Sequence, residues 1–286
     1  MDLYLAGTGS PVEGIKEQGG HDVNLYLAES GGLWGAYFKG GGDNEHILSQ
    51  AHLATIGGNA FSGTNILQSF YYCNEFTEKE IIPYCKRFML DSGAFTFFSS
   101  GKHVDWNEYV NRYAQFITRN NVKIFFKLDI DVLIGYEKVL YYRAMLEDLT
   151  GKKCIPVWHK SRGKAEYLKM CEEYDYVAIG GIVTKEIKQT DYKHFPYFIS
   201  EAHKRGAKVH GLGFTNLQGL TKYKFDSVDS TAWLSGNRFG SIYVFDGKTM
   251  IKHDKNPGQR LASARQVALH NFNEWKKFQQ YAEVKL

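Results

Sequence analysis

The chain has 286 residues, of which 43% are hydrophobic, and its net charge at neutral pH is only +4. This length is too great for a small disulfide-stapled fold and suits one large α/β barrel or two ordinary domains. The weak positive charge is compatible with a nucleic-acid partner but does not by itself indicate one.

The cysteines and the apolar segments indicate in which cellular compartment the protein is expected. The four cysteines form no C-x-x-C pair and no cluster with histidine at zinc-binding spacing, which is typical of reduced thiols. Residues 1–6 carry an acid where a signal peptide has its basic region. No apolar run approaches the about 20 residues that span a membrane. We therefore expect a soluble, cytoplasmic protein.

Short apolar runs alternate with amphipathic stretches of helical length, a pattern that predicts βαβ units and a parallel sheet. Eight strands would suffice for a closed (β/α)8 barrel, so we expect an α/β fold of this kind as a single domain over residues 1–286. A doubly wound open sheet is the alternative, but no G-x-G-x-x-G follows the first expected strand. The expected strands lie in residues 2–7, 66–72, 88–91, 122–131, 154–159, 176–181, 207–214 and 224–230. The expected helices include residues 136–149, 164–174 and 191–206.

Two segments do not fit this repeat. Residues 8–63 are rich in glycine and too long for a simple crossover, so we expect an insertion or lid there. Residues 257–286 are amphipathic, and we expect a helical tail that closes the fold, with phosphate contact by its Arg and Lys as the alternative.

Polar residues or glycines stand where the expected strands end, and this is where a (β/α)8 barrel carries its chemistry. A single acid in such a place is equally explained as a helix N-cap, but several acids on one rim indicate a site. The residues are Asp91 and Ser92, Asp129 and Asp131, Trp158 and His159, Gly180 and Gly181, His210 and Gly211, and Asp229 and Ser230.

These residue types favour chemistry at a glycosidic bond. Two carboxylates that flank such a bond can serve as nucleophile and as general acid/base when their surroundings separate their pKa values. The backbone N–H groups of Gly180 and Gly181 can approach a flat ligand closely because no Cβ intervenes.

Other residue types near the strand ends leave more than one interpretation open. Phe95, Phe97 and Phe98 could stack on a planar ring, although core packing explains two of the three. His159 is equally consistent with a satisfied histidine on the rim. The scattered histidines give no metal-binding spacing, and no G-x-S-x-G indicates a serine hydrolase.

With these motifs the sequence resembles the tRNA-guanine transglycosylase superfamily, and most of all the branch with which phages put 7-deazaguanines into DNA. LDSGAF (residues 90–95) matches the motif whose acid is the general acid/base and whose aromatic ring stacks on the base, which implies Asp91 and Phe95. AIGG (residues 178–181) matches the segment whose backbone contacts the guanine edge. The resemblance covers residues 88–237, about half of the chain.

The same resemblance implies further roles. DSTAW matches the string that the family's nucleophile opens, which implies Asp229, with Asp226 as a near miss. LDID aligns with the base-reading aspartate at Asp129, with Asp131 as the alternative. His210 falls where the family places the second wall of the base sandwich.

The sequence also departs from the family. PVWHK (residues 156–160) stands in place of the Gln-Gly-Gly motif, and His159 is the candidate to replace the glutamine. The family's zinc-binding Cys₃His segment and C-terminal RNA-binding module have no counterpart in the sequence. We therefore expect no metal cofactor, and DNA rather than tRNA as the substrate.

The resemblance thus implies an enzyme, a pentosyltransferase that exchanges guanine in DNA for a free 7-deazaguanine base of the preQ0 type, in the host cytoplasm if a phage encodes it. Lys and Arg of the insertion, of residues 159–164 and of the tail would contact phosphates. A tRNA substrate, a barrel hydrolase and a binding protein remain alternatives, and a homodimer or a partner protein is open. The implied substrate-binding residues are Ser92, Phe95, Asp129, Asp131, His159, Gly180, Gly181, His210 and Gly211.

Overall fold

A computed structural model describes residues 24–28, 61–93, 97, 104–214, 216–234, 240–256 and 264–286 of the chain. Eight strands form one sheet in the order β4-β3-β2-β1-β8-β7-β6-β5, and every pairing within it is parallel. The predicted α/β fold with a parallel sheet is therefore confirmed. The strands are β1 (Asn24–Ala28), β2 (Asn65–Ser69), β3 (Arg87–Asp91), β4 (Ile124–Phe125), β5 (Val157–Trp158), β6 (Tyr176–Ile179), β7 (Lys208–Gly211) and β8 (Ser227–Ser230).

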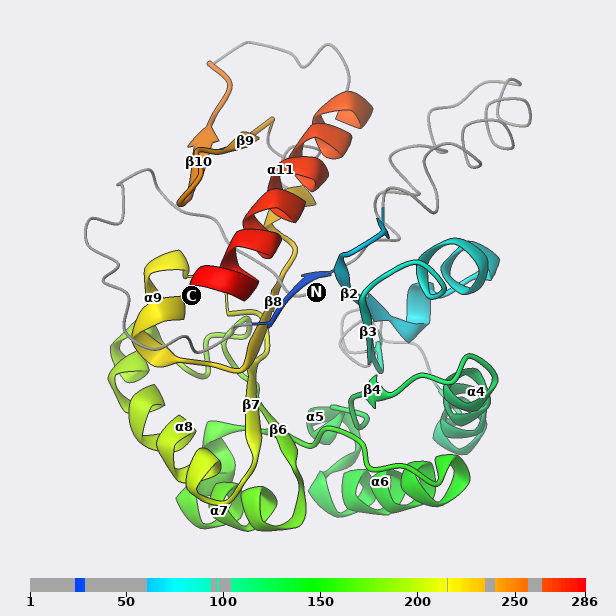
Figure 1. Cartoon of the computed structure of the whole chain (residues 1–286). Helices are drawn as coiled ribbons and strands as arrows, with labels where there is room; N and C mark the ends of the chain where they lie inside the picture. Colours follow the sequence, from blue (N-terminus) through cyan, green and yellow to red (C-terminus); the bar gives the residue numbers. More distant parts are fainter. Residues whose placement is uncertain are drawn as a thin grey trace.

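Helices lie around the outside of these strands (Figure 1). Local sequence sets their ends: the carboxylate of Asp105 caps the first turn of α4 by accepting from two backbone N–H groups, and Gly151 ends α6 in the left-handed conformation. The longer helices are α4 (Trp106–Arg119), α6 (Tyr136–Thr150), α7 (Gly163–Glu173), α8 (Phe195–Lys204), α9 (Leu217–Tyr223) and α11 (Ala264–Lys285). Shorter helical turns are η1 (Phe70–Tyr72), η2 (Thr77–Ile81), α5 (Asp131–Ile134), η3 (Lys160–Arg162), η4 (Gln189–His194) and η5 (Ala232–Leu234).

The two ends of the sheet order also meet. Phe126, just after β4, forms a parallel bridge with Ile155, just before β5. The N–H of Lys127 donates to the carbonyl of Ile155 at 3.0 Å, and the N–H of Ile155 donates to the carbonyl of Phe125 at 2.8 Å. The segments that carry β4 and β5 therefore lie side by side.

Buried side chains form two clusters, and strand β3 contributes to both of them. Met89 belongs to the larger cluster, whereas its neighbour Leu90 belongs to a second cluster with Tyr113 of α4 and Leu146 of α6. This opposition follows from the alternation of side chains along a strand. Both faces of β3 are thus buried, as expected for a parallel strand covered by helices.

Three parts of the fold differ from the prediction. The first described strand, β1, lies within residues 8–63, where we expected an insertion, and it pairs with β2 and β8. The strand expected at residues 2–7 lies outside the described residues. The strand expected at residues 122–131 is shorter, because Asp131 already begins α5. A separate antiparallel pair, β9 (Ile242–Phe245) and β10 (Met250–His253), was not predicted.

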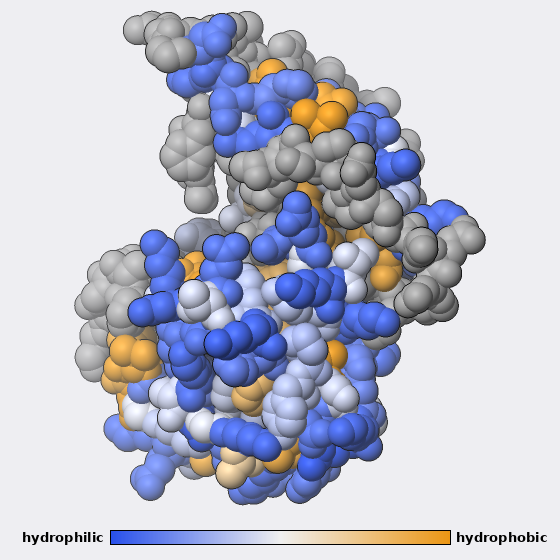
Figure 2. Space-filling model, turned by 90° about the vertical axis from the view of Figure 1, so that its left-hand side faces the viewer, coloured by the Kyte–Doolittle hydropathy of each residue, from blue (hydrophilic) through white to orange (hydrophobic). Residues whose placement is uncertain are grey.

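The C-terminal helix confirms the helical tail expected within residues 257–286. Helix α11 contacts β1 and β9, and Glu283 near its end pairs with Lys86 and Arg87 at the start of β3. The face of the molecule in Figure 2 is mainly hydrophilic, with hydrophobic residues in small groups. Within the described segments, no helix combines the length and the apolar character needed to cross a membrane.

Candidate active site

Asp91, the last residue of β3, is a half-buried carboxylate with an unusual proton affinity. The pKa of Asp91 is raised to about 6, mainly by burial. The charges of Asp129 and Asp229 also raise this pKa, whereas the hydrogen bond from the N–H of Gly93 lowers it. The N–H of Gly93 lies 2.8 Å from Oδ2 of Asp91. Asp91 at the end of β3, Asp229 near the end of β8 and Asp129 beyond β4 therefore share one electrostatic environment.

Asp229 on β8 is held by one of its two carboxylate oxygens. Oδ1 accepts from the backbone N–H of Gly213 at 2.5 Å and lies 3.2 Å from Nε2 of His210. Its side chain is 12% exposed. Within the described part of the chain, no hydrogen bond reaches Oδ2, so this oxygen remains available to a ligand.

His210 on β7 is fully buried, and both of its ring nitrogens have partners. Nδ1 lies 2.6 Å from Oγ of Ser227, whose hydroxyl is also hydrogen-bonded to the hydroxyl of Tyr176. The ring packs at a tilt against Phe126, with 5.3 Å between centroids. This structure does not support the expectation that His210 stacks on a base, because the ring is fully buried.

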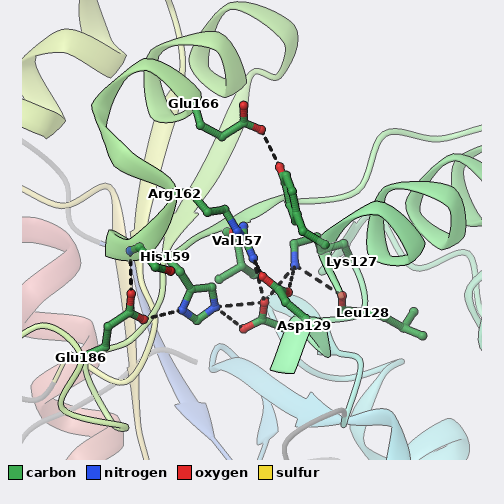
Figure 3. A network of polar contacts seen from close by, with 11 residues as sticks. Lys127, Leu128, Asp129, Val157, His159, Arg162, Glu166 and Glu186 are labelled. Carbon is green, nitrogen blue, oxygen red and sulfur yellow. Dashed lines mark hydrogen bonds and ion pairs between the residues drawn. The ribbon is translucent and has the colours of Figure 1, made fainter. Parts of the chain in front are cut away.

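A second group of charges lies beyond β4 and contains a lysine with 1% exposure (Figure 3). Nζ of Lys127 lies 2.8 Å from Oδ1 of Asp129 and 3.5 Å from Oδ1 of Asp131. Burial lowers the pKa of Lys127, and the charge of Asp129 counteracts this. Burial acts to raise the pKa of Asp129, but Lys127 and His159 outweigh it and hold the pKa below its usual value. Asp129 is therefore an anion within this network.

His159 bridges two carboxylates. Its Nε2 lies 2.8 Å from Oδ2 of Asp129, and its Nδ1 lies 2.9 Å from Oε2 of Glu186. Burial acts to lower the pKa of His159, but the hydrogen bonds and charges of the two carboxylates raise it above the usual value. The two carboxylates thus stabilise the protonated imidazole, in which both nitrogens donate.

Arg162 completes this network from η3. Its guanidinium hydrogen-bonds to the carboxylate of Asp131 and to the carbonyl of Val157, and it lies 4.4 Å from the ring centroid of Tyr136. The side chain is only 8% exposed. A phosphate contact of the basic run at residues 159–164 is therefore not supported for Arg162, because its guanidinium is paired with the carboxylate of Asp131.

The glycines at two strand ends make room for neighbouring side chains. A Cβ on Gly180 would lie 2.7 Å from Cγ1 of Val157 and 3.1 Å from Cε1 of His159. A Cβ on Gly211 would lie 3.1 to 3.2 Å from Phe214, Phe225 and Val228. Gly211 is thus closely packed against core side chains, and its expected role in substrate binding is not supported.

Ser92 is a fully buried residue next to Asp91. Among the described residues its hydroxyl has no hydrogen-bond partner, although its carbonyl accepts from Tyr109 at 2.6 Å. Phe95 and Phe98 lie outside the described residues. Phe97 makes edge-to-face contacts with three aromatic rings, as a core residue does, so stacking on a substrate is not supported for it.

Sequence reasoning missed several residues that hold the predicted ones in place. Lys127 had a detectable signal, because a lysine within the apolar run IFFKLDI needs a counter-charge and Asp129 follows two positions later on the same face. No such signal existed for Arg162, Glu186, Ser227 and Tyr176, since the side chains with which they form these hydrogen bonds lie at least 17 positions away.

The site also bears on cofactors and relatives. Among the described residues, no group of three or more His, Cys, Asp or Glu side chains is placed to hold a metal ion. The chain matches no protein-family model and no curated protein.

Proposed function

We propose that the chain is a base-exchange transglycosylase, which replaces guanine in DNA with a free 7-deazaguanine. One observation carries this proposal: Asp91 at the end of β3 and Asp229 near the end of β8 are two carboxylates that interact electrostatically and have different surroundings. Asp91 has a pKa of about 6, whereas Asp229 is anchored through Oδ1. Retaining exchange at a glycosidic bond needs such a pair, one acid able to exchange a proton and one carboxylate able to attack.

The proposal includes a closed (β/α)8 barrel. Its support is the parallel bridge between Phe126 and Ile155, which joins the two ends of the sheet order. Contact between the rings of Phe126, after β4, and His210, on β7, also fits side chains that meet inside a barrel. In a barrel, Asp91 and Asp229 face one ligand site at the carboxyl ends of the strands.

In the first step, Oδ2 of Asp229 attacks C1′ of the target nucleotide. The bond from C1′ to the guanine nitrogen breaks, and its electron pair leaves with guanine. Asp91, protonated over part of the neutral range, gives its proton to a ring nitrogen of the departing base. The sugar is left as an ester on Asp229, with inverted configuration at C1′.

In the second step, the incoming 7-deazaguanine loses its ring N–H proton to the carboxylate of Asp91. The nitrogen then bonds to C1′, the ester bond to Asp229 breaks, and the configuration is restored. Protons and electron pairs balance over the two steps, so Asp91 and Asp229 return to their starting states. The target base must leave the stack before this chemistry, which costs a few kcal/mol for a paired base.

Two nearby groups support binding of a polar ring. The buried hydroxyl of Ser92 lacks a partner among the described residues, and such a hydroxyl costs about 1–3 kcal/mol unless a ligand or water satisfies it. The anionic Asp129 keeps a side-chain exposure of 21%, so an N–H edge of a base can reach it alongside Lys127 and His159.

The test is to incubate the protein with duplex DNA, and separately with tRNA, together with a mixture of 7-deazaguanine bases. Each nucleic acid is then digested to nucleosides and analysed by mass spectrometry. Asp229→Asn should abolish incorporation. Asp226→Asn is the matched control, because Asp226 accepts from the N–H of Val209 at 2.7 Å and pairs with His203 at 2.8 Å, which makes it a structural carboxylate.

The outcomes separate the candidate functions. A deazaguanine nucleoside in DNA alone, lost only in Asp229→Asn, is the expected result. The same mass in tRNA alone would reassign the substrate. Release of guanine with an abasic site and no incorporation would indicate a hydrolase. No change in either nucleic acid would contradict the proposal.

A further inference from the structure

We propose that Tyr176, Ser227 and His210 form a hydrogen-bond chain that orients Asp229 and leaves Oδ2 as its attacking oxygen. These are positioning residues, since they act through Asp229. The inference rests on the transglycosylase reaction proposed above. It also replaces the role in base stacking that the sequence implied for His210.

The hydrogen-bond chain crosses three adjacent strands. Tyr176 opens β6, His210 lies on β7, and Ser227 and Asp229 lie two positions apart on β8, on the same face. His210 is also the register partner of Ser227. The fold therefore connects a phenol, a hydroxyl, an imidazole and a carboxylate through successive hydrogen bonds.

Only one direction of donation satisfies every member. The carboxylate of Asp229 can only accept, so Nε2 of His210 carries the proton and donates to Oδ1 over 3.2 Å. In the neutral ring, Nδ1 then accepts from the hydroxyl of Ser227 over 2.6 Å. The Ser227 oxygen in turn accepts from the hydroxyl of Tyr176, with which it is hydrogen-bonded.

Burial keeps this histidine neutral. Desolvation lowers the pKa of His210 below its usual value, although the hydrogen bond and charge of Asp229 counteract it. Burial likewise raises the pKa of Tyr176, so the phenol keeps the proton that it donates. His210 and Ser227 are both fully buried, which shields the chain from competing water.

The consequence concerns the geometry of attack. Oδ1 accepts from two donors, the ring of His210 and the N–H of Gly213, so the carboxylate cannot rotate without losing both. A neutral donor fixes the carboxylate without neutralising it with a full positive charge. Asp229 therefore presents Oδ2 to C1′ in a fixed orientation. Loss of the hydrogen-bond chain should lower the turnover rate more than it weakens substrate binding.

The experiment compares Ser227→Ala, Tyr176→Phe and His210→Gln with Tyr167→Phe. Tyr167 is the matched control, because it is a fully buried tyrosine that takes no part in the hydrogen-bond chain. Its hydroxyl donates to the carbonyl of Phe198. Guanine exchange is measured with a radiolabelled base to obtain kcat and KM. In parallel, nitrogen NMR of the histidine-labelled protein reports the tautomer of His210, with His210→Gln assigning its signals.

The expected result is a neutral ring protonated at Nε2 in the unmodified protein and a mixture of tautomers in Ser227→Ala. The value of kcat should fall about tenfold or more in Ser227→Ala, and less in Tyr176→Phe, with KM nearly unchanged. Tyr167→Phe should leave both constants unchanged.

Two results would overturn the inference. A positively charged ring of His210, or a neutral ring with its proton on Nδ1, would contradict the hydrogen-bond chain whether or not the protein exchanges guanine. Exchange that proceeds equally in Ser227→Ala and Tyr167→Phe would remove the positioning role while the proposed function stands. Conversely, if the protein shows the expected tautomer of His210 but exchanges no guanine, the hydrogen-bond chain stands and the proposed transglycosylase reaction is rejected.

Discussion

A Cβ atom on Gly181 would lie 2.7 Å from Oε2 of Glu186, the oxygen that also meets Nδ1 of His159 at 2.9 Å. Gly181 has a φ of +80°, a conformation that other residues rarely adopt. The backbone just after β6 therefore leaves the space in which the carboxylate of Glu186 contacts the imidazole of His159.

The first prediction follows from this contact. Gly181→Ala should destabilise the protein by about 2–4 kcal/mol, because strain at positive φ adds to displacement of Glu186. Gly163→Ala is the matched control, since Gly163 has a φ of +75° and no atom near its would-be Cβ; it should lose about 1 kcal/mol. Urea unfolding of both variants measures the difference, and equal losses would contradict a role for Glu186.

The stability that the protein loses when His159 is replaced should depend on pH in a defined direction. The pKa of His159 is raised in the folded protein by Asp129 and Glu186, against the effect of burial. The stability contributed by its proton is complete below the unfolded pKa near 6.5 and is lost as pH rises through the higher folded value. His159→Gln should therefore lose more stability at pH 6 than at pH 9. Denaturant titrations at both pH values test this, and a loss independent of pH would refute it.

Asp91→Asn should stabilise the protein at high pH while it abolishes exchange. Burial raises the pKa of Asp91 to about 6, so ionisation works against folding. This penalty is absent below the unfolded pKa near 4 and complete above 6. We expect a gain of about 1–2 kcal/mol at pH 8, allowing for partial exposure, and little change at pH 4. Thermal unfolding across this range measures the gain, and a loss of stability at pH 8 would disprove the assignment.

Arg162→Ala should cost about 2–3 kcal/mol, because it removes a guanidinium that is only 8% exposed from the carboxylate of Asp131, which then keeps only Lys127 at 3.5 Å as a charged partner. Arg112→Ala is the control, because Arg112 is 64% exposed and lies 3.9 Å from Glu108; its loss should stay within about 0.5 kcal/mol. Guanidinium-induced unfolding compares the two variants. Similar losses would mean that the guanidinium of Arg162 does not stabilise the network.

The fold was largely predictable where strands and helices alternate. The expected helices at residues 136–149 and 164–174 match α6 and α7 closely, because their apolar periodicity is undisturbed. Strand β1 was missed because its five residues stand within a glycine-rich segment, and its partners β2 and β8 are invisible to local patterns. Strand assignment there depends on pairing across the whole chain.

The site was predictable in part. Asp91, Asp129 and Asp229 were found because each follows an apolar run, and the structure gives them a common electrostatic environment. The partners of His159 and His210 were not, since hydrogen bonds between distant strands leave no local trace. The raised pKa of Asp91 depends on burial and neighbouring charges, which only the packed structure provides.

The pairing of β1 with β8 has a consequence for how the protein is made. Asn24 and Ser227 are register partners about 200 positions apart, so the ribosome releases β1 long before its neighbour exists. Contacts this far apart in sequence slow folding, because the intervening chain must be ordered first. Asp229, carried on β8, can reach its final setting only once both strands have emerged. A polypeptide stalled during synthesis before residue 227 should therefore lack β8, the strand between β1 and β7. The edges of β1 and β7 would then be exposed to chaperones and to other polypeptides.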